Sequence, residues 1–422
     1  MNWDDVDNAI TGNADWAFAL LAQLVAAPST LGHETAAQEV LATALADLGF
    51  AITRLPIPAD IATDPAAGLP RVPYTPDRYD VIGERGRAAT PSLLLNGHID
   101  VVPAEAATEW RTPPFEPSRR DGRLYGRGAG DMKAGFAAGL LALRALDEVA
   151  ETWQHGRLTF VSAIEEECTG NGTLATGRAG YTADAALLLE PTDLSILLGG
   201  VGIVWLDITV TGRAAHAHVA THAVNPILAA RPVLDALYAL ERDLDAEHRR
   251  NPDPPYADLD HPYTINIGTA HAGDWPSSVP AIARFGVRIG HPRRWTADEA
   301  TDRVRTAIIA ACADDPWLSA HPPTVTMSGF RAEGHALPPD APLADQLADA
   351  HHRAHGSKPP RVTVGSTTDA RYYLNQFDTP ALAYGPRAFD IHGTDESVDL
   401  ASVIDTARTL TRFLTVHFGA TP

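Results

Sequence analysis

Several stretches of this chain place a histidine or a carboxylate directly after an apolar run. The first is Leu93–Pro103, in which three leucines lead to Gly97, His98 and, two residues later, Asp100. In a strand, residues i and i+2 point to the same side, so His98 and Asp100 would share one face at its carboxyl end. A histidine held by a nearby carboxylate is a frequent metal-ligand arrangement, because the carboxylate fixes the ring tautomer. A buried histidine satisfied by an aspartate has the same sequence, so this stretch leaves both interpretations open.

Further carboxylates follow later apolar segments. The run Glu165–Glu167 ends the predicted strand 157–164, and Glu190 ends the predicted strand 185–189. Parallel α/β sheets place their active sites at the carboxyl ends of strands, which favours a site over a solvated charge run. We therefore expect these glutamates to gather with His98 at one edge of a sheet.

The segment Gly126–Asp131 contains three alternating glycines and at first resembles a phosphate-binding loop. The dinucleotide-binding pattern needs a strand directly before the glycines, whereas the proline-rich stretch 108–125 precedes them here. The alternative is that the glycines allow a tight turn that presents Asp131 in front of the predicted helix 134–150. Helix capping is a further interpretation of Asp131.

The totals describe an ordinary globular protein. At 422 residues, with 45% hydrophobic and 20% charged residues, two domains are expected. The net charge of −20 argues against nucleic acid or an anionic membrane as a partner. The two cysteines, Cys168 and Cys312, exclude a disulfide framework and a cysteine-rich zinc site, and they fit a reducing compartment. The start of the chain has no basic segment and the apolar run 16–27 is too short to span a bilayer, so we expect a cytoplasmic protein.

Hydrophobic periodicity predicts two different patterns along the chain. Residues 1–201 and 331–422 alternate helices and strands as a doubly wound α/β domain does, with a first helix over 13–24 capped by Asn13 or Asp15, and with loops over 58–76 and 108–125. Residues 202–330 read as strand–helix–strand–strand–helix–strand, the ferredoxin-like split βαβ order. We therefore predict an α/β catalytic domain made of 1–201 and 331–422 and an inserted domain made of 202–330.

Six motifs occur together in order. They are Pro28-Ser29-Thr30, Gly97-His98-Ile99-Asp100-Val101-Val102, the segment Gly126–Gly135, Glu165–Glu167, Glu190-Pro191-Thr192 and Ile391-His392-Gly393. Over nearly the whole chain this order resembles the M20 family of metallopeptidases and deacylases, in particular the acetylornithine deacetylase and succinyl-diaminopimelate desuccinylase branch. The resemblance implies a zinc-peptidase-like catalytic domain with a mixed, mainly parallel sheet, and an inserted ferredoxin-like α+β lid and dimerisation domain.

The resemblance also implies a site for two divalent metal ions, zinc in the first place with cobalt as the alternative. Its ligands by motif position are His98 and Glu190 for one metal, Glu167 and His392 for the other, and Asp131 as the bridge. Zinc prefers histidine nitrogen and carboxylate oxygen, which agrees with these residue types. For His392 alone, a surface histidine is the plainer interpretation.

Two further residues receive catalytic roles from the same resemblance. Asp100 would orient His98 from behind the metal. Glu166 would be the general base that takes a proton from water and passes it to the leaving amine. The family usually has Asp-Glu-Glu where this chain has Glu165–Glu167, so a slip of one residue would exchange the roles of Glu165 and Glu166.

The inserted domain contributes catalytic and substrate-binding candidates. His216 lies in a segment that resembles the family's Gly-x-x-Ala-His, where the histidine reaches the site, often that of the partner subunit, and stabilises the oxyanion. His218 and His222 lie close enough to be confused with it. Arg288 matches an arginine that binds the substrate carboxylate, although an arginine paired on a sheet face would have the same pattern.

The substrate pocket is also where the chain departs from its relatives. Ser278 replaces the asparagine that often precedes Val-Pro in the lid, and Gly385-Pro386-Arg387 replaces Gly-Pro-Gly. The segment from Gly365 to Asp369 resembles one that lines the pocket. These departures prevent a particular substrate from being carried over.

The expected protein is a zinc-dependent amidohydrolase, acting on linear amide bonds, that removes an acyl group from an N-acyl amino acid or related amine by attack of metal-activated water. A dipeptidase or carboxypeptidase and an N-carbamoyl amino acid hydrolase are alternatives on the same scaffold. A non-catalytic binding protein that retains the fold is the alternative of another class. The expected partners are a small-molecule substrate and a second copy of the chain, bound through the lid.

Overall fold

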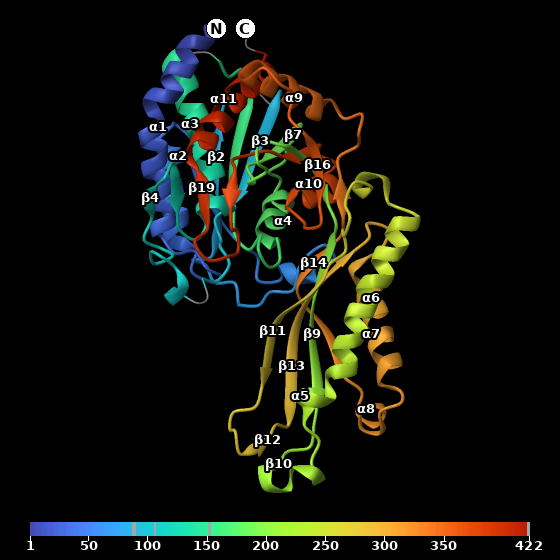
Figure 1. Ribbon diagram of the computed structural model, residues 1–422. Coiled ribbons are helices and arrows are strands. Elements are labelled where there is room, and N and C mark those ends of the chain that lie inside the picture. Colours follow the sequence, from blue (N-terminus) through green and yellow to red (C-terminus); the bar gives the residue numbers. More distant parts are fainter. Residues whose placement is uncertain (87–89, 105–106, 151–152, 420–422) are drawn as a thin grey trace.

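A mixed sheet of nine strands forms the centre of the larger part of the chain (Figure 1). The computed structural model describes residues 1–86, 90–104, 107–150 and 153–419. The strand order is β1-β2-β6-β3-β7-β17-β8-β15, and β16 pairs with β8. The central strand β3 is parallel to both β6 and β7, while β1 and β2 are antiparallel at one edge. The strands are β1 (Ala51–Pro56), β2 (Tyr79–Arg85), β3 (Ser92–His98), β6 (Arg157–Ala163), β7 (Ala185–Leu188), β8 (Ile196–Gly200), β15 (His335–Ala336), β16 (Arg361–Val364) and β17 (Ala381–Ala383).

Helices cover both faces of this sheet, which explains why the side chains of its central strands are buried almost throughout. Leu93 and Leu95 of β3 belong to the hydrophobic cluster that contains the long helices α1, α3 and α11, whereas Leu94 packs in the cluster that contains residues of α10. The alternation follows from the two-residue repeat of a strand. The helices of this part are α1 (Trp3–Ala26), α2 (Thr35–Asp47), α3 (Ala134–Val149), α4 (Asn171–Arg178), α9 (Pro342–His355), α10 (Ala370–Gln376) and α11 (Leu400–His417).

A second, small antiparallel sheet lies beside the first. Two of its strands lead into loops that carry predicted site residues. Its order is β18-β19-β5-β4, with β18 at Ala388–Phe389, β19 at Ser397–Asp399, β5 at Arg123–Tyr125 and β4 at Ser118–Arg120. The loop that follows β5 and the loop between β18 and β19 therefore begin side by side.

The smaller part of the chain, which we call the lid, is a four-stranded antiparallel sheet with two long helices on one face (Figure 1). Its strand order, β11-β13-β9-β14, and its element order match the predicted ferredoxin-like motif. The lid elements are β9 (Gly202–Thr211), β10 (Ala215–His216), α5 (Pro226–Ala229), α6 (Arg231–Arg250), β11 (Ile265–Ala272), β12 (Ser278–Val279), β13 (Ile282–His291), α7 (Ala297–Cys312), α8 (Pro316–Ala320) and β14 (Thr324–Ala332). The lid has its own hydrophobic cluster, drawn from Val201 to Ala332.

Two sequence expectations about local structure are wrong. The first helix begins at Trp3, with the Asn2 side chain as its cap, so Asn13 lies inside the helix. Its early turns are held by packing against α3 and α11, which the local pattern did not reveal. The stretch 108–125 contains β4 and β5, which are too short to show a two-residue alternation.

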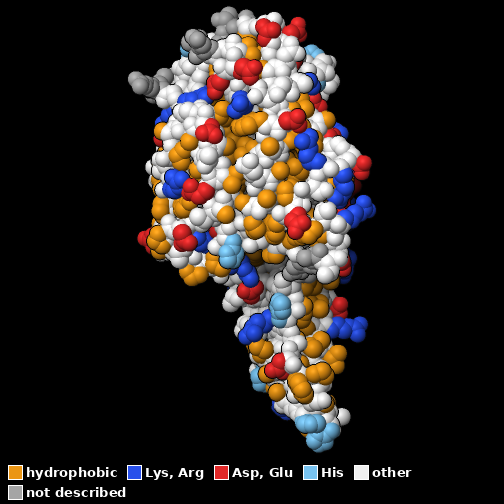
Figure 2. All heavy atoms as spheres, turned by 90° about the vertical axis from the view of Figure 1, so that its left-hand side faces the viewer, with side chains coloured by type: hydrophobic (Ala, Val, Ile, Leu, Met, Phe, Trp, Pro, Cys, Tyr) orange, Lys and Arg blue, Asp and Glu red, His pale blue; other side chains and the backbone are white. Residues whose placement is uncertain are grey.

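Figure 2 shows the lid as a narrow projection below the wider part, with histidine side chains gathered at its tip. Acidic side chains are scattered over this face and form no single patch. Among the residues that the structure describes, no helix is both long and apolar enough to cross a membrane.

The lid joins the larger part where β8 passes into β9 and where β14 passes into β15. Gly200 and Gly202 flank Val201 here, and a Cβ atom on Gly202 would lie 2.1 Å from the ring of His291. His291 and His335 are both buried at this junction. Burial lowers the pKa of His291 to about 4 and the pKa of His335 to about 3. Two neutral imidazoles are thus packed against the glycines of the connection.

We expect the free energy of unfolding to fall as the pH decreases from 6.5 toward 4. A histidine whose folded-state pKa lies below its unfolded value binds fewer protons when folded, so acid favours the unfolded chain. His291→Gln and His335→Gln should each make this decline shallower, by up to about 1.4 kcal/mol per pH unit. Denaturant unfolding at several pH values measures the slope. His352→Gln, at an exposed position of α9, should keep the parental slope, and equal slopes in all four proteins would contradict the assignment.

Candidate metal centre

His98 is the last residue of β3 and is buried at the carboxyl edge of the sheet. Its Nε2 lies 3.1 Å from Oδ1 of Asp131 and 3.8 Å from Oε2 of Glu190, which follows β7. Neighbouring parallel strands therefore deliver two of the predicted site residues to one place. The close approach of the Asp131 segment depends on Gly97, where a Cβ atom would lie 2.4 Å from the side chain of Met132.

Asp100 is buried beside His98, but the contact differs from the expected one. Nδ1 of His98 lies 2.9 Å from the backbone carbonyl oxygen of Asp100 and 3.8 Å from its carboxylate Oδ1. The carboxylate instead accepts hydrogen bonds from the backbone N–H groups of Glu166 and Glu167, both at 3.1 Å. Asp100 holds the histidine ring with its main chain and the glutamate turn with its side chain.

The first two of the three consecutive glutamates have opposite surroundings. Glu165 is fully buried with a φ of 65°, and its oxygens accept hydrogen bonds from Arg78 at 2.7 Å and from the hydroxyls of Tyr74 and Thr169 at 2.6 Å. Glu166 lines the neighbouring cavity, and its carboxylate accepts no hydrogen bond from any residue that the structure describes. Of these two carboxylates, Glu166 is therefore the one with oxygens available for a substrate or a water molecule.

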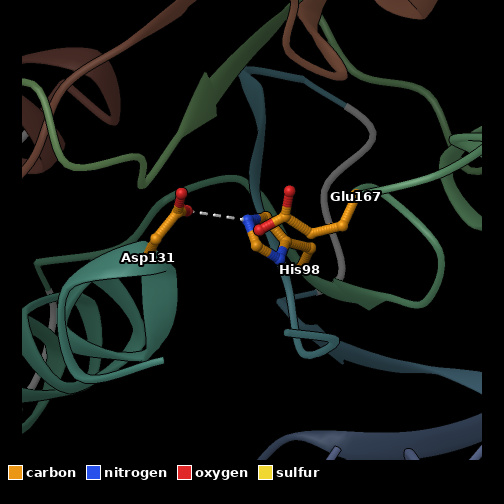
Figure 3. A group of neighbouring side chains, drawn as sticks. All are labelled: His98, Asp131 and Glu167. Atoms are coloured by element: carbon orange, nitrogen blue, oxygen red, sulfur yellow. Dashed lines mark hydrogen bonds and ion pairs between the residues drawn. The ribbon is translucent and has the colours of Figure 1, made fainter. Parts of the chain in front are cut away.

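His392 and Glu167 complete the cluster around Asp131. Nε2 of His392 lies 3.0 Å from Oε1 of Glu167 and 3.3 Å from Oδ2 of Asp131. The two oxygens of Asp131 thus face one histidine each. Potential ligand atoms of His98, Asp131 and Glu167 all lie within 4.8 Å of one another, and Figure 3 shows their side chains pointing toward a common centre.

Glu396 holds the turn that carries Asp131, although it was not among the predicted site residues. Its buried carboxylate accepts hydrogen bonds at 2.8–3.1 Å from the backbone N–H groups of residues 128, 130 and 131, and one at 2.6 Å from Arg127. These contacts replace the phosphate that the alternating glycines at first suggested. The available signal was an acidic residue four positions after His392, in the same loop.

Burial and mutual repulsion disfavour the charged forms of these carboxylates. Burial raises the pKa of Glu190 to about 8 and the pKa of Asp100 to about 7. Burial also raises the pKa of Glu166 well above its ordinary value, with Asp369 and Glu190 adding repulsion. Burial is the main cause of these shifts, and repulsion between neighbouring carboxylates adds to it.

The histidines respond in the opposite direction. Burial disfavours a charged His98, but the acceptor Asp131 and the nearby Glu190 outweigh it, so the pKa of His98 is raised well above its usual range. Glu167 raises the pKa of His392 to about 11. Cations placed in this cluster would replace these protons.

A cavity of about 900 Å³ extends from the carboxylates to the lid sheet. It is lined by both parts of the chain, and much of its wall is apolar. The apolar wall includes Leu31, Val101, Ile203, Trp205, Phe330 and Ile391.

Of the predicted substrate residues, Arg288 and Gly365 lie together. Arg288 lines the cavity and donates hydrogen bonds to the carbonyl oxygen of Gly365 at 2.7 Å and to the hydroxyl of Thr264 at 2.8 Å. Asp369 is fully buried behind the wall, where it accepts a hydrogen bond from Thr173 at 2.5 Å. Asp369 is therefore not part of the described cavity surface.

His216 and Ser278 lie elsewhere. They pair with each other between β10 and β12 at the tip of the lid, and neither lines the cavity. The structure thus separates them from the carboxylates of their own chain (Figure 1).

Comparison with known proteins relates this arrangement to a family. The sequence profile of peptidase family M20/M25/M40 matches residues 94–416. The chain belongs to this peptidase family. It is accordingly a metal-dependent hydrolase of amide bonds, as the resemblance of its motifs implied.

Individual relatives and solved structures match nearly the full length of the chain. A succinyl-diaminopimelate desuccinylase from Methylobacterium radiotolerans is 30% identical over 414 residues, covering 96% of this chain and 97% of its own. A dipeptidase from Saccharomyces cerevisiae has the same fold, with a TM-score of 0.82 at 16% identity and coverage of 100% and 99%. A dinuclear metal-binding peptidase of the family from Bacillus subtilis gives a TM-score of 0.59 at 13% identity, covering 99% and 100%.

The donor set of this M20 site fits divalent cations. Imidazole nitrogens and carboxylate oxygens are the ligands that zinc prefers in catalytic sites. Burial raises the pKa values of Glu190 and Glu166, and cations bound beside them would stabilise their charged forms.

We expect Glu396→Gln to weaken metal binding by about 10- to 100-fold, because the turn that carries Asp131 loses the charged acceptor of its N–H groups. Competition with a chromophoric chelator measures the affinity, and circular dichroism reports whether the fold persists. Glu116→Gln removes an exposed glutamate and should retain the parental affinity. Unchanged affinity in a folded Glu396→Gln protein would show that this carboxylate does not position the site.

Proposed function

We propose that this protein removes an acyl group from N-acyl amino acids or related amines, in the manner of an acetylornithine deacetylase. The observation that carries the proposal is Glu166, a buried carboxylate that faces the cavity without a hydrogen-bond partner among the described residues. It adjoins the cluster of His98, Asp131 and Glu167. The desuccinylase relative, which by its name removes an acyl group from an amine, supports the same reaction class.

We further propose that the cluster holds two divalent cations, most naturally zinc, with cobalt as a substitute. His98 and Glu190 would hold one, Glu167 and His392 the other, with Asp131 between them. The two oxygens of Asp131, each facing one histidine, support a bridging role. When bound, such a pair polarises the amide carbonyl and activates a water molecule.

Glu166 would accept the proton of the attacking water and deliver it to the departing amine. Burial, which raises the pKa of Glu166, favours retention of that proton until the amine takes it. The occupied oxygens of Glu165 support Glu166 over its neighbour for this role. Asp100 contributes by holding the backbone of the turn that carries Glu166. On the cavity wall, Arg288 would bind the substrate carboxylate.

We propose a homodimer formed through an inserted domain over residues 202–330. His216 does not line the cavity of its own chain, so a role at the oxyanion requires the lid tip of a second copy to reach the site. Ser278, opposite His216 in the tip, would then contact substrate from the same direction. The separate hydrophobic cluster of the lid supports the proposed domain boundaries. The two buried free cysteines fit the reducing cytoplasm.

Hydrolysis of a substrate panel tests the reaction. We expect the zinc- or cobalt-loaded protein to release free amine from one class among N-acetyl, N-succinyl and N-formyl amino acids, and N-carbamoyl amino acids in the panel test the alternative hydrolase. Dipeptides in the same panel separate deacylation from peptidase activity, and metal quantification on the same sample counts the ions. Cleavage of dipeptides alone, or of no compound, would contradict the proposed deacylase.

Glu166→Ala should lower turnover by at least about a hundredfold while the metal content stays near that of the parent. The matched variant is Glu165→Gln, which disturbs the buried pair with Arg78 and should lower the melting temperature with a much smaller loss of turnover. Hydrolysis by Glu166→Ala at the parental rate would remove Glu166 from the mechanism.

A further inference from the structure

One wall of the cavity is a row of side chains that crosses all four strands of the lid sheet. Asn266 of β11 lies opposite Arg288 of β13. Arg288 lies opposite Trp205 of β9, and Trp205 lies opposite Ser328 of β14. Directly opposed residues of an antiparallel sheet share one face, and all four residues line the cavity. The four side chains therefore form one continuous row on the cavity wall.

Arg71 joins this row from the larger part of the chain. Two backbone hydrogen bonds between Leu69 and Gly329, at 2.8 and 3.1 Å, dock its segment on β14. Nη1 of Arg71 lies 3.4 Å from the hydroxyl of Ser328, and its Cζ lies 5.9 Å from the centre of the Trp205 ring. Arg71 also lines the cavity. The segment that was expected to be a surface loop thus brings a cation to the lid wall.

Trp205 separates the two arginines as a fixed apolar surface. Neighbouring strands are about 4.8 Å apart, so Arg288 and Ser328, the residue that Arg71 contacts, occupy positions two strand spacings apart, roughly 10 Å. The Trp205 ring packs edge-on against Phe330, with ring centres 5.2 Å apart. A Cβ atom on Gly329 would lie 2.4 Å from the same ring, which shows how closely the backbone confines it.

The charges of the cavity are divided between its ends. The candidate metal ligands and Glu166 make one end acidic, whereas Arg71 and Arg288 are the only arginine or lysine residues among the described residues that line the cavity. Asp207, two positions beyond Trp205 on β9, is a carboxylate of the same wall. Arg71 forms no ion pair with it or with any other described residue. A guanidinium group that faces a cavity without an anionic partner is suited to bind a carboxylate.

We propose that Arg71 is a specificity-determining residue that binds a second carboxylate of the substrate, in addition to the one assigned to Arg288. The inference rests on the proposed deacylase function and narrows it to N-acyl amino acids that carry two carboxylates. A short apolar chain lying over Trp205 would connect the two anionic groups. The second carboxylate belongs either to the acyl group or to the side chain of the amino acid.

Two pairs of compounds distinguish these sources. N-succinyl-alanine and N-succinamoyl-alanine differ by a carboxylate or a carboxamide on the acyl group. N-acetyl-glutamate and N-acetyl-glutamine differ in the same way on the amino acid. In the metal-loaded protein we expect kcat/KM to favour the carboxylate by at least about tenfold in one pair, because a site built for that group rejects the uncharged analogue.

Arg71→Met should reduce this preference by about 10- to 100-fold while kcat/KM for the carboxamide stays within about twofold. Arg231→Met is the matched control, since it removes the same charge from an exposed position of α6 and should leave the preference unchanged. Dissociation constants for the same compounds, measured by calorimetry on metal-loaded Glu166→Ala, give the preference independently of turnover.

The proposal is overturned if neither pair shows a preference for the carboxylate, or if the preference survives Arg71→Met. If the parent hydrolyses neither these amides nor any acyl compound of the wider panel, the deacylase function fails by itself, and the ratio of dissociation constants still decides the role of Arg71. If turnover is normal but Arg71→Met leaves the carboxylate preference unchanged, the deacylase function is retained and the second carboxylate site is rejected.

Discussion

The structure depends on bringing several buried carboxylates together at one edge of a sheet. Two unit charges 4 Å apart at an effective dielectric constant near 20 repel each other by about 4 kcal/mol, so such a cluster persists only where the fold opposes the repulsion. Burial, with this repulsion in addition, raises the pKa values of Glu190 and Glu166. Cations bound by His98, Asp131 and their neighbours would offset this repulsion, and the same cluster would then serve as a binding site.

Outer residues distribute the remaining charge. Asp100 accepts hydrogen bonds from the N–H groups of the glutamate turn, and Glu396 accepts them from those of the glycine-rich turn. Backbone dipoles therefore stabilise both carboxylates. Glu165 forms an ion pair with Arg78 and accepts hydrogen bonds from two hydroxyls. This division leaves Glu166 without such partners, and an unpartnered acid beside a metal site is what a proton transfer requires. The lid contributes positive charge to the cavity, because the arginines of the cavity wall lie on its sheet or are docked against it.

Much of the architecture could be predicted because it follows from short-range patterns. The alternation of Gly202–Thr211 and the apolar run before His98 report burial on one or two faces of a sheet, and both strands lie where expected. The element order of the lid followed in the same way. Predictions failed where packing decides, as in the first turns of α1, which α3 and α11 stabilise. They also failed for β4 and β5, which pair with each other and gain the distant strand β19 as the second partner of β5.

For the site, the sequence by itself determined which residue types follow which strands, and hence that His98, Glu167 and Glu190 would meet at one sheet edge. Tertiary structure alone decided how their neighbours are used. In the folded chain Glu165 pairs with Arg78, whereas Glu166 faces the cavity. Glu396 accepts a hydrogen bond from the backbone of Asp131, and Arg71 contacts a lid strand more than 250 residues away. The physical reason is that the two-residue repeat of a strand can be recognised in a short stretch of sequence. The partner of a buried charge is chosen by contacts between segments that only the folded chain brings together.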